Sequence, residues 1–395
     1  MKFAVEKGPH IQNKRSTFSM MVELGICLLG LFLFEMISYY VSFGGEWGNH
    51  ALIIFVISVG VSVGSDALYL IPSCLCDKKE KDIKIRFKNW GYKILHSYGW
   101  ISGLIFTLLL PIGVDYYACA VSAFIGTFFG KCIFGGFGRN IFNPAVAGRV
   151  FCQLCFSSSM KTYIGTAPAA GDFNAGASIM FSTQQAGWLN GTYDIPLDRL
   201  FLGQIHAGSM GESCIIGLII CCVYLAVRRI IDWRTPVFYI VTFYLTCLFM
   251  GFTGGLGADS FAFALKNIMI GGVLFGCVFC LTDPVTSPAS RYGRIMVTVI
   301  CAFIACLIRY QAAAPEGVGS SIIITNMLSP LNSKLIKGKS NQHIARKSII
   351  ISSIMVASII FGLVYGTFHK ANASVSLIEA IAQIPNYSVF IGGAF

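Results

Sequence analysis

The chain has 395 residues, of which 55% are hydrophobic and only 12% are charged, and its formal net charge is +11. A soluble domain needs roughly 25% charged residues to cover its surface, so this composition excludes an ordinary water-soluble protein. It also speaks against a nucleic-acid partner, because the lysines and arginines gather in particular loops, as membrane topology requires. The composition therefore predicts an all-α integral membrane protein that binds no nucleic acid.

Apolar runs that can cross a hydrocarbon core of roughly 30 Å recur along the chain. The N-terminal arm and every second loop are rich in lysine and arginine, which predicts that they lie in the cytoplasm. We therefore expect a multi-pass protein of the bacterial inner membrane, with a cytoplasmic N-terminus. About ten or eleven transmembrane helices are predicted, near residues 19–43, 50–73, 92–112, 114–134, 143–157, 213–227, 236–254, 261–281, 295–312, 318–333 and 348–367.

The loop between the fifth and sixth predicted helices is unusually long. Residues 158–212 form a polar segment rich in glycine, alanine and serine, on the side opposite the basic loops. Long loops in compact proteins are commonly functional. The preceding helix, 143–157, is short, which indicates a half-helix or a broken helix rather than a complete crossing.

Two segments interrupt predicted helices in a matching way. The first reaches Asn143-Pro144 after a glycine-rich stretch, and the second contains Thr282-Asp283-Pro284. Proline removes a backbone donor and the asparagine or aspartate before it caps the next helix, so polar backbone is left facing inward. About five predicted helices precede the long loop and five follow it, which favours a 5+5 inverted repeat with paired broken helices. Two ordinary loop turns are the alternative.

Ionisable side chains within the predicted helices are costly in lipid and commonly face a cavity or a partner. They are Glu23, Glu35, Asp66, Lys266 and Arg309. For Glu23 and Arg309, extension toward the membrane interface is a sufficient explanation, whereas it is a weaker one for Asp66 and Lys266. The cysteines lack the paired spacing of a zinc or iron–sulfur site, so we predict no metal centre.

Several motifs follow one another along the chain: Gly8-Pro9-His10-Ile11, the stretch 135–151 with its Asn-Pro-Ala core, Gly-Ser-Met-Gly-Glu-Ser at 208–213, Thr-Asp-Pro-Val-Thr-Ser-Pro at 282–288, and Pro315-Glu316-Gly317 followed by Asn326. In this order they resemble the D subunit of the Rnf electron-transport complex and its relative, the B subunit of the sodium-translocating NADH:quinone reductase. The Pro-His-Ile sequence near the start, the short N-terminal arm and the Thr-Asp-Pro motif favour the Rnf protein. The stretch 138–149 is closer to the quinone-reductase protein.

The resemblance implies a flavoprotein. Members of this family carry FMN in phosphoester linkage to a hydroxyl residue, attached outside the cytoplasm by a flavin transferase. The matching stretch here contains Asp172, Gly176 and Ala177 and ends at Ser178, the expected attachment residue. Serine stands here in place of threonine, and its missing methyl group leaves the side chain freer to rotate. The alternative is an incidental serine in a surface loop. A second, non-covalent flavin such as riboflavin is also compatible with the resemblance.

The function that the resemblance implies is that of a subunit in a redox-driven ion translocase. Such a subunit would pass electrons through FMN and couple them to Na⁺ or H⁺ transport, together with the other subunits of a membrane complex. Asn143, Thr282 and Asp283 are candidates for ion coupling or flavin contact, because an acidic group there faces broken helices. The alternatives are the quinone-reductase B subunit and, in another class, a secondary transporter or channel without flavin.

The resemblance also divides the chain. We expect a cytoplasmic N-terminal arm at 1–18, a membrane domain at 19–335 that includes the outer loop, and an extension at 336–395. The extension contains a basic linker, an extra transmembrane helix and an outer tail, whereas family members usually end soon after the helix at 318–333. The extra helix is either a lineage-specific addition or the fused membrane anchor of a neighbouring flavin-bearing subunit.

Overall fold

The computed structural model describes residues 15–74, 82–161, 180, 184, 187–191, 197–201, 208–312, 316–336 and 344–382. Within these ranges the regular structure is helical, and the only β-type contact is an isolated bridge between Pro111 and Ser209. The prediction of an all-α protein is confirmed.

Some of the helices before the long loop begin at residues whose side chains cap them. Ser16 accepts a hydrogen bond from the Ser19 N–H at 3.2 Å, and Asp82 accepts one from the Lys84 N–H at 2.9 Å. Such bonds satisfy N–H groups that have no partner in the first turn of a helix. The helices are α1 (Thr17–Phe43), α2 (Gly45–Cys74), α3 (Ile83–Ser97), α4 (Gly99–Leu109), α5 (Tyr116–Thr127) with the π-helical η1 (Phe128–Cys132), and α6 (Pro144–Cys155).

Two short helices are described within the long loop, and the rest follow it. The helices of the loop are α8 (Trp188–Gly191) and α9 (Leu197–Phe201). Those after it are α10 (Ile215–Val227), α11 (Arg234–Gly254), α12 (Ser260–Met269), α13 (Val273–Phe275) with the π-helical η4 (Gly276–Cys280), α14 (Arg291–Gln311), α15 (Val318–Leu335) and α16 (Ile344–Ala382).

The described helices suit a multi-pass membrane protein. Five are long and apolar enough to cross a membrane, namely α1, α2, α11, α14 and α16, and the bent pair Gly257–Met269 with Val273–Cys280 makes a sixth. The bend in that pair is 62°. Each of the other predicted spans coincides with a shorter or less apolar helix. Large apolar side chains such as Val41 and Phe368 are 82% and 65% exposed, as expected where lipid is the solvent.

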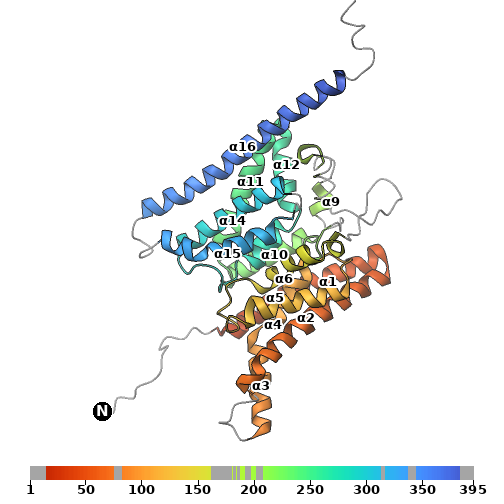
Figure 1. Cartoon of the computed structure of the whole chain (residues 1–395), viewed down its shortest axis with the longest axis vertical. Coiled ribbons are helices and arrows are strands. Elements are labelled where there is room, and N and C mark those ends of the chain that lie inside the picture. Colours follow the sequence, from red (N-terminus) through yellow and green to blue (C-terminus); the bar gives the residue numbers. More distant parts are fainter. Residues whose placement is uncertain are drawn as a thin grey trace, which may run out of the picture.

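The third predicted span begins later than expected. The segment 92–112 is divided at Tyr98, whose φ angle of 56° turns the chain between α3 and α4. α3 has no buried residue, and Figure 1 shows it projecting from the bundle. Its charged face requires water, so the apolar run proper starts at Gly99.

The two parts of the chain pack as neighbouring groups. Figure 1 shows α1, α2, α4, α5 and α6 on one side, and α11, α14, α15 and α16 on the other. α16 packs along α11 and α14. A Cβ atom at Gly362 or Gly366 of α16 would collide with backbone carbonyl groups of α11, so these glycines allow the helices to approach closely. The Thr246 and Ser358 hydroxyl groups share a hydrogen bond of 2.6 Å across this contact.

Candidate functional site

A π-helical turn comes just before each of the two interruptions. The first turn, η1, continues α5, and the second, η4, continues α13. Such turns are rare and are frequently found at functional sites. Sequence reasoning missed both, because the extra residue of a π turn leaves no clear mark in an apolar run. The paired turns support the match between the two interruptions, and the complete inverted repeat stays a prediction.

A glycine-rich bend follows η1. The φ angles of Gly135, Gly136 and Gly138 are 112°, 85° and 87°, in the region that residues with a Cβ atom rarely adopt. α6 follows, and Asn143 is the residue that caps its N-terminus. The side-chain oxygen of Asn143 accepts a hydrogen bond from the Ala145 N–H at 3.1 Å. The predicted capping role of this asparagine is therefore confirmed.

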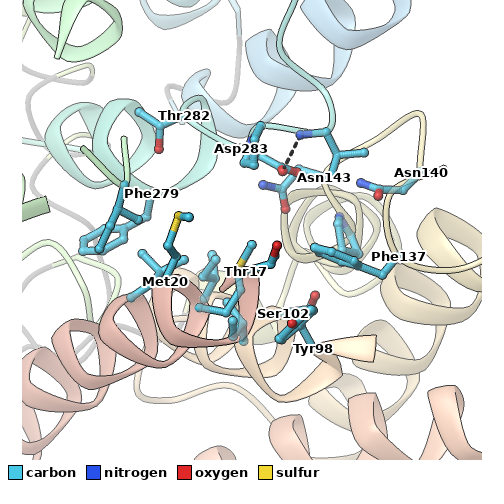
Figure 2. A pocket seen from close by; sticks show the side chains of 18 of the residues that line it. Thr17, Met20, Tyr98, Ser102, Phe137, Asn140, Asn143, Phe279, Thr282 and Asp283 are labelled. Atoms are coloured by element: carbon cyan, nitrogen blue, oxygen red, sulfur yellow. Dashed lines mark hydrogen bonds between the residues drawn. The ribbon is translucent and has the colours of Figure 1, made fainter. Parts of the chain in front are cut away.

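Asn143 also joins the two interruptions. Its side-chain amide donates to the carbonyl oxygen of Cys280, the last residue of η4, at 3.2 Å. Thr282 and Asp283 follow directly, and Asp283 Oδ1 accepts a hydrogen bond from the Val285 N–H at 3.0 Å. Figure 2 shows Asn143 beside Asp283. The three predicted coupling residues thus lie together, at what we call the Asn143–Asp283 junction.

A cavity of about 220 Å³ lies at this junction. Much of its wall is apolar, with Met20 from α1, Phe137 from the glycine-rich bend and Phe279 from η4 (Figure 2). Asn143 and Asp283 add polar groups to the lining. An apolar cavity with a few convergent polar groups is typical of sites for small molecules and cofactors.

Asp283 lies in the connection between two membrane segments. Burial raises the pKa of its carboxyl group above the ordinary value, while hydrogen bonds from the Val285 N–H and the Asn140 amide oppose the rise. A raised pKa makes the carboxyl group easier to protonate. The junction therefore contains an acidic group suited to proton or cation chemistry.

Lys131 of η1 borders the same cavity. Its Nζ atom lies 2.7 Å from Asp66 Oδ2, and the two side chains are only 2% and 1% exposed. Lys131 also donates to the Ser97 carbonyl oxygen at 2.5 Å, and the Cys132 thiol donates to Asp66 at 3.4 Å. Lys131 is therefore the partner that a carboxyl group at position 66, within an apolar helix, was expected to have. Sequence reasoning missed Lys131, although a lysine within an apolar run was a usable signal.

Arg309 does not extend to the interface, so that expectation is wrong. Its side chain is 1% exposed. It donates to the carbonyl oxygens of Asn267 at 2.6 Å and of Ile270 and Gly271 at 2.9 Å. These carbonyl groups lie where α12 ends and have no helical donors of their own. The guanidinium group supplies the missing donors, which explains how the charge is accommodated within the bundle.

A second polar cluster lies near the same helix break. Arg149 forms an ion pair with Glu316, and Glu212 accepts a hydrogen bond from the Ser209 hydroxyl at 2.5 Å. The four residues line a cavity of about 30 Å³ beside Gly272. Burial, and then the charge of Glu316, raises the pKa of Glu212, which lies in the connection before α10, to about 7. Sequence reasoning missed this cluster, although both glutamates stand in quoted motifs.

The model of one protein family, described as NQR2, RnfD, RnfE, matches residues 4–342 of the chain. The chain belongs to this family. Its relatives include the D subunit of a proton-translocating ferredoxin:NAD(+) oxidoreductase complex from Clostridium ljungdahlii, which is 27% identical over 338 residues. That alignment covers 84% of this chain and 94% of the relative. The resemblance inferred from the motifs is therefore confirmed.

Two further relatives of this NQR2/RnfD/RnfE member bear on its place in the family. The D subunit of a Na(+)-translocating ferredoxin:NAD(+) oxidoreductase complex from Acetobacterium woodii is 27% identical over 339 residues, covering 85% of this chain and 94% of that relative. The B subunit of a Na(+)-translocating NADH-quinone reductase from Chromohalobacter salexigens is 28% identical over 243 residues. That match covers 61% of this chain and 58% of the reductase protein.

The expected flavin-attachment stretch of this family member, with Asp172, Gly176, Ala177 and Ser178, lies outside the described residues. The next described residue is Met180, which is 1% exposed.

Met180 is in contact with the bundle. Its sulfur atom lies 3.9 Å from Arg309 Nη2. A few residues later the Trp188 ring meets the Tyr310 ring edge-on, with the ring centres 5.0 Å apart. Met180 and Trp188 are therefore both in contact with α14.

The C-terminal helix of this family member lies beyond the family match. The match ends at residue 342, and α16 begins at Ile344. The hydroxyl group of Tyr365 in α16 donates to the Tyr310 carbonyl oxygen at 3.2 Å, and its ring stacks on the His369 ring at 5.3 Å. α16 thus contacts the same tyrosine that holds Trp188 of the outer loop.

Proposed function

We propose that this protein is the D-type subunit of an Rnf-type ion-translocating oxidoreductase complex. The observation that carries the proposal is the nearly full-length match to the D subunits of the two ferredoxin:NAD(+) oxidoreductase complexes, which covers 94% of each. The match to the quinone-reductase B subunit covers only 58% of that protein, which favours the Rnf assignment over the alternative. In this role the chain acts with the other subunits of a membrane complex.

The transported ion is Na⁺ or H⁺. The two D subunits are both 27% identical to this chain, and their names specify different ions. Overall similarity therefore does not favour one ion. The Asn143–Asp283 junction is the proposed coupling site, because a half-buried carboxyl group with a raised pKa stands there beside the end of a broken helix. The Val285 N–H and the Asn140 amide would position that carboxyl group, while Asn143 and Thr282 hold the adjoining end of η4 through the Cys280 and Val278 carbonyl oxygens.

We propose that FMN is attached through its phosphate to the hydroxyl oxygen of Ser178. Serine offers the nucleophilic oxygen that a phosphoester requires, and a flavin transferase would catalyse the attachment. Met180, two residues further along the chain, is in contact with Arg309 of α14, so a flavin on Ser178 would be attached close in sequence to a residue that is packed against the bundle. Bound there, FMN would supply one- and two-electron redox chemistry, while the protein fixes its distance and orientation.

The junction cavity suits the ring system of a second, non-covalent flavin such as riboflavin. Phe137 and Phe279 offer apolar surfaces, and Tyr98 also faces the cavity (Figure 2). The Asn140 amide and the Asp283 carboxyl group can form hydrogen bonds with the polar edge of such a ring. These residues would bind and orient the ring.

We also propose that the N-terminus lies in the cytoplasm and that the membrane is the bacterial inner membrane. The charge bias supports this orientation. One cavity is bordered by the start of α1, the corner at Tyr98 and the turn at Ile230. These three segments therefore lie on the same side of the bundle as the N-terminus. This orientation requires the long loop to face outward, where the transferase would act.

Fluorescence of the denatured protein tests the covalent flavin. The full chain, co-expressed with a flavin transferase, should give a band that fluoresces under ultraviolet light after denaturing electrophoresis. Ser178→Ala should be dark and Ser178→Thr bright, with Ser182→Ala as a bright control. If the wild-type band is dark although the transferase is active, the chain does not carry covalent FMN. The broken helices would then favour a secondary transporter or channel without flavin.

A further inference from the structure

A basic pocket of about 650 Å³ lies beside the Asn143–Asp283 junction. It is formed by the turn between α10 and α11 and by the start of α14, and it shares Thr282 and Pro284 with the junction cavity. Its charged lining consists of Arg229, Asp232, Arg234, Arg291 and Arg294. Four arginines and one aspartate leave a formal charge of +3 in the lining.

Asp232 neutralises only part of this charge. Its carboxyl group lies 3.0 Å from Arg294 Nη1 and 3.7 Å from Arg234 Nη1. Neither Arg229 nor Arg291 forms an ion pair with a carboxylate among the described residues. Two guanidinium groups in one pocket are thus available to an anion, and their planar donor arrangement suits phosphate oxygens.

Two helix ends meet at the pocket. Arg229 has a φ angle of 56° and closes the C-terminus of α10, where the Ile230 N–H donates to the Leu225 carbonyl oxygen at 2.9 Å. The other helix end is the start of α14, a helix of 21 residues that contributes Arg291 and Arg294 to the pocket and whose dipole favours an anion at its N-terminus.

The surroundings of the pocket indicate a lipid rather than a soluble anion. Val227 and Trp233 flank its arginines and are 75% and 54% exposed. Val237, one turn into α11, is 44% exposed. Apolar side chains exposed on a membrane protein face acyl chains, and tryptophan is typical of the membrane interface. A phospholipid can therefore place its headgroup in the pocket while its chains lie along α10 and α11.

We propose that this basic pocket binds the phosphate group of an anionic phospholipid. The site is independent of the flavin assignments. Each arginine near such a headgroup contributes about fivefold in affinity, equivalent to about 1 kcal/mol. Removing both Arg229 and Arg291 should thus weaken binding about 25-fold.

Native mass spectrometry of the purified full chain, titrated with phosphatidylglycerol or phosphatidylcholine, tests this proposal. Arg229→Gln/Arg291→Gln should lose about 25-fold in affinity for phosphatidylglycerol. The control Lys84→Gln/Lys88→Gln removes the same charge from the exposed surface of α3 and should change affinity less than about twofold. Equal losses in both variants, or none in the first, would overturn the proposal. So would release of the bound lipid by millimolar inorganic phosphate, because a soluble anion would then be the ligand.

A glycine variant separates binding from folding. Arg229→Gly removes the guanidinium group and also relieves the left-handed strain, so its melting temperature should stay unchanged or rise. Its affinity for phosphatidylglycerol should nevertheless fall about fivefold. A normal affinity in this well-folded variant would exclude Arg229 from the site and contradict the proposal.

Discussion

The side-chain amide of Asn143 donates to the backbone carbonyl oxygen of Cys280 across 137 positions of sequence, at 3.2 Å. The same side chain caps α6 through the Ala145 N–H. One residue therefore begins a helix in one part of the chain and satisfies the end of a π turn in another. A direct hydrogen bond thus joins the two interruptions.

Variants at Asn143 should separate these two roles. Asn143→Ala loses both the cap and the bond to Cys280, so its free energy of unfolding should fall by about 2 kcal/mol. Asn143→Ser retains a capping oxygen but cannot donate to Cys280, so about 1 kcal/mol should be lost. Thermal melting in detergent measures both, with the exposed Asn89→Ala as a control. Wild-type stability of the serine variant would show that the Cys280 bond contributes nothing.

The buried ion pair between Lys131 and Asp66 should behave as a unit. Lys131→Met leaves a buried carboxylate without its cation and should cost about 3–5 kcal/mol of stability. Asp66→Leu/Lys131→Met removes both charges and should be less destabilised than the lysine variant alone. A double-mutant cycle on denaturation midpoints measures the coupling.

A surface pair provides the comparison. Glu23 and Arg228 lie 2.6 Å apart, but the arginine side chain is 38% exposed. Breaking this pair with Arg228→Gln should leave the denaturation midpoint almost unchanged, because solvent screens the pair. In the double-mutant cycle on Lys131 and Asp66, losses of stability that simply add would show that these two residues are not coupled.

Close packing of α16 should protect the outer loop from proteolysis. Gly366→Leu places a side chain against the Met250 carbonyl group and should separate α16 from α11. Tyr310 would then lose its contact with Tyr365, and the segment around Trp188 should be cleaved about tenfold faster, equivalent to about 1.4 kcal/mol of local stability.

Mass spectrometry of timed digests measures the rate of this cleavage. Ala357→Leu adds the same side chain on the exposed face of α16 and is the matched control. The same cleavage rate in both variants would mean that α16 does not hold the loop.

Stability should depend on pH through Glu212. Its pKa in the folded protein is about 7, above the ordinary value of 4.5. The folded state therefore binds more protons than the unfolded state between these two pH values, and stability falls as the pH rises through that window. The loss should approach about 3 kcal/mol between pH 4.5 and pH 8.

Melting temperatures measured at pH 5 and pH 8 test this sign. The wild type should melt at a lower temperature at pH 8, and Glu212→Gln should reduce the difference. Glu46→Gln, at an exposed position, should leave the difference unchanged. A wild-type protein that is more stable at pH 8 would contradict the assignment.

Sequence reasoning predicted features that depend on local pattern. The apolar runs predicted the helices, and the two prolines predicted the interruptions, because helix breaking acts within a few residues. The capping prediction is right for Asn143 and wrong for Asp283, which caps only a turn, because α14 begins later, at Arg291, and is capped by Ser290. Asp66 was predicted to face a partner for an equally local reason, the cost of a carboxylate in lipid. The position of the third span was wrong only because the turn at Tyr98 has no composition signal.

Features that depend on tertiary contacts were not predictable. Arg309 near the end of a helix suits an interfacial residue equally well, and only the break after α12 explains its burial. Arg149 and Glu316 are 167 positions apart, and no local pattern pairs them. Lys131 is the exception, since an isolated lysine in an apolar run could have been assigned to Asp66.

The crossing by α16 decides which compartment receives the end of the chain. The basic segment before it and the residues after Lys370 lie at opposite ends of a 27-residue apolar span. A reporter protein joined after residue 340 and one joined after residue 382 should thus occupy different compartments. A tag joined after residue 382 should therefore be reached from the side of the long loop. In a family member that stops before this helix, a C-terminal tag would be reached from the basic side.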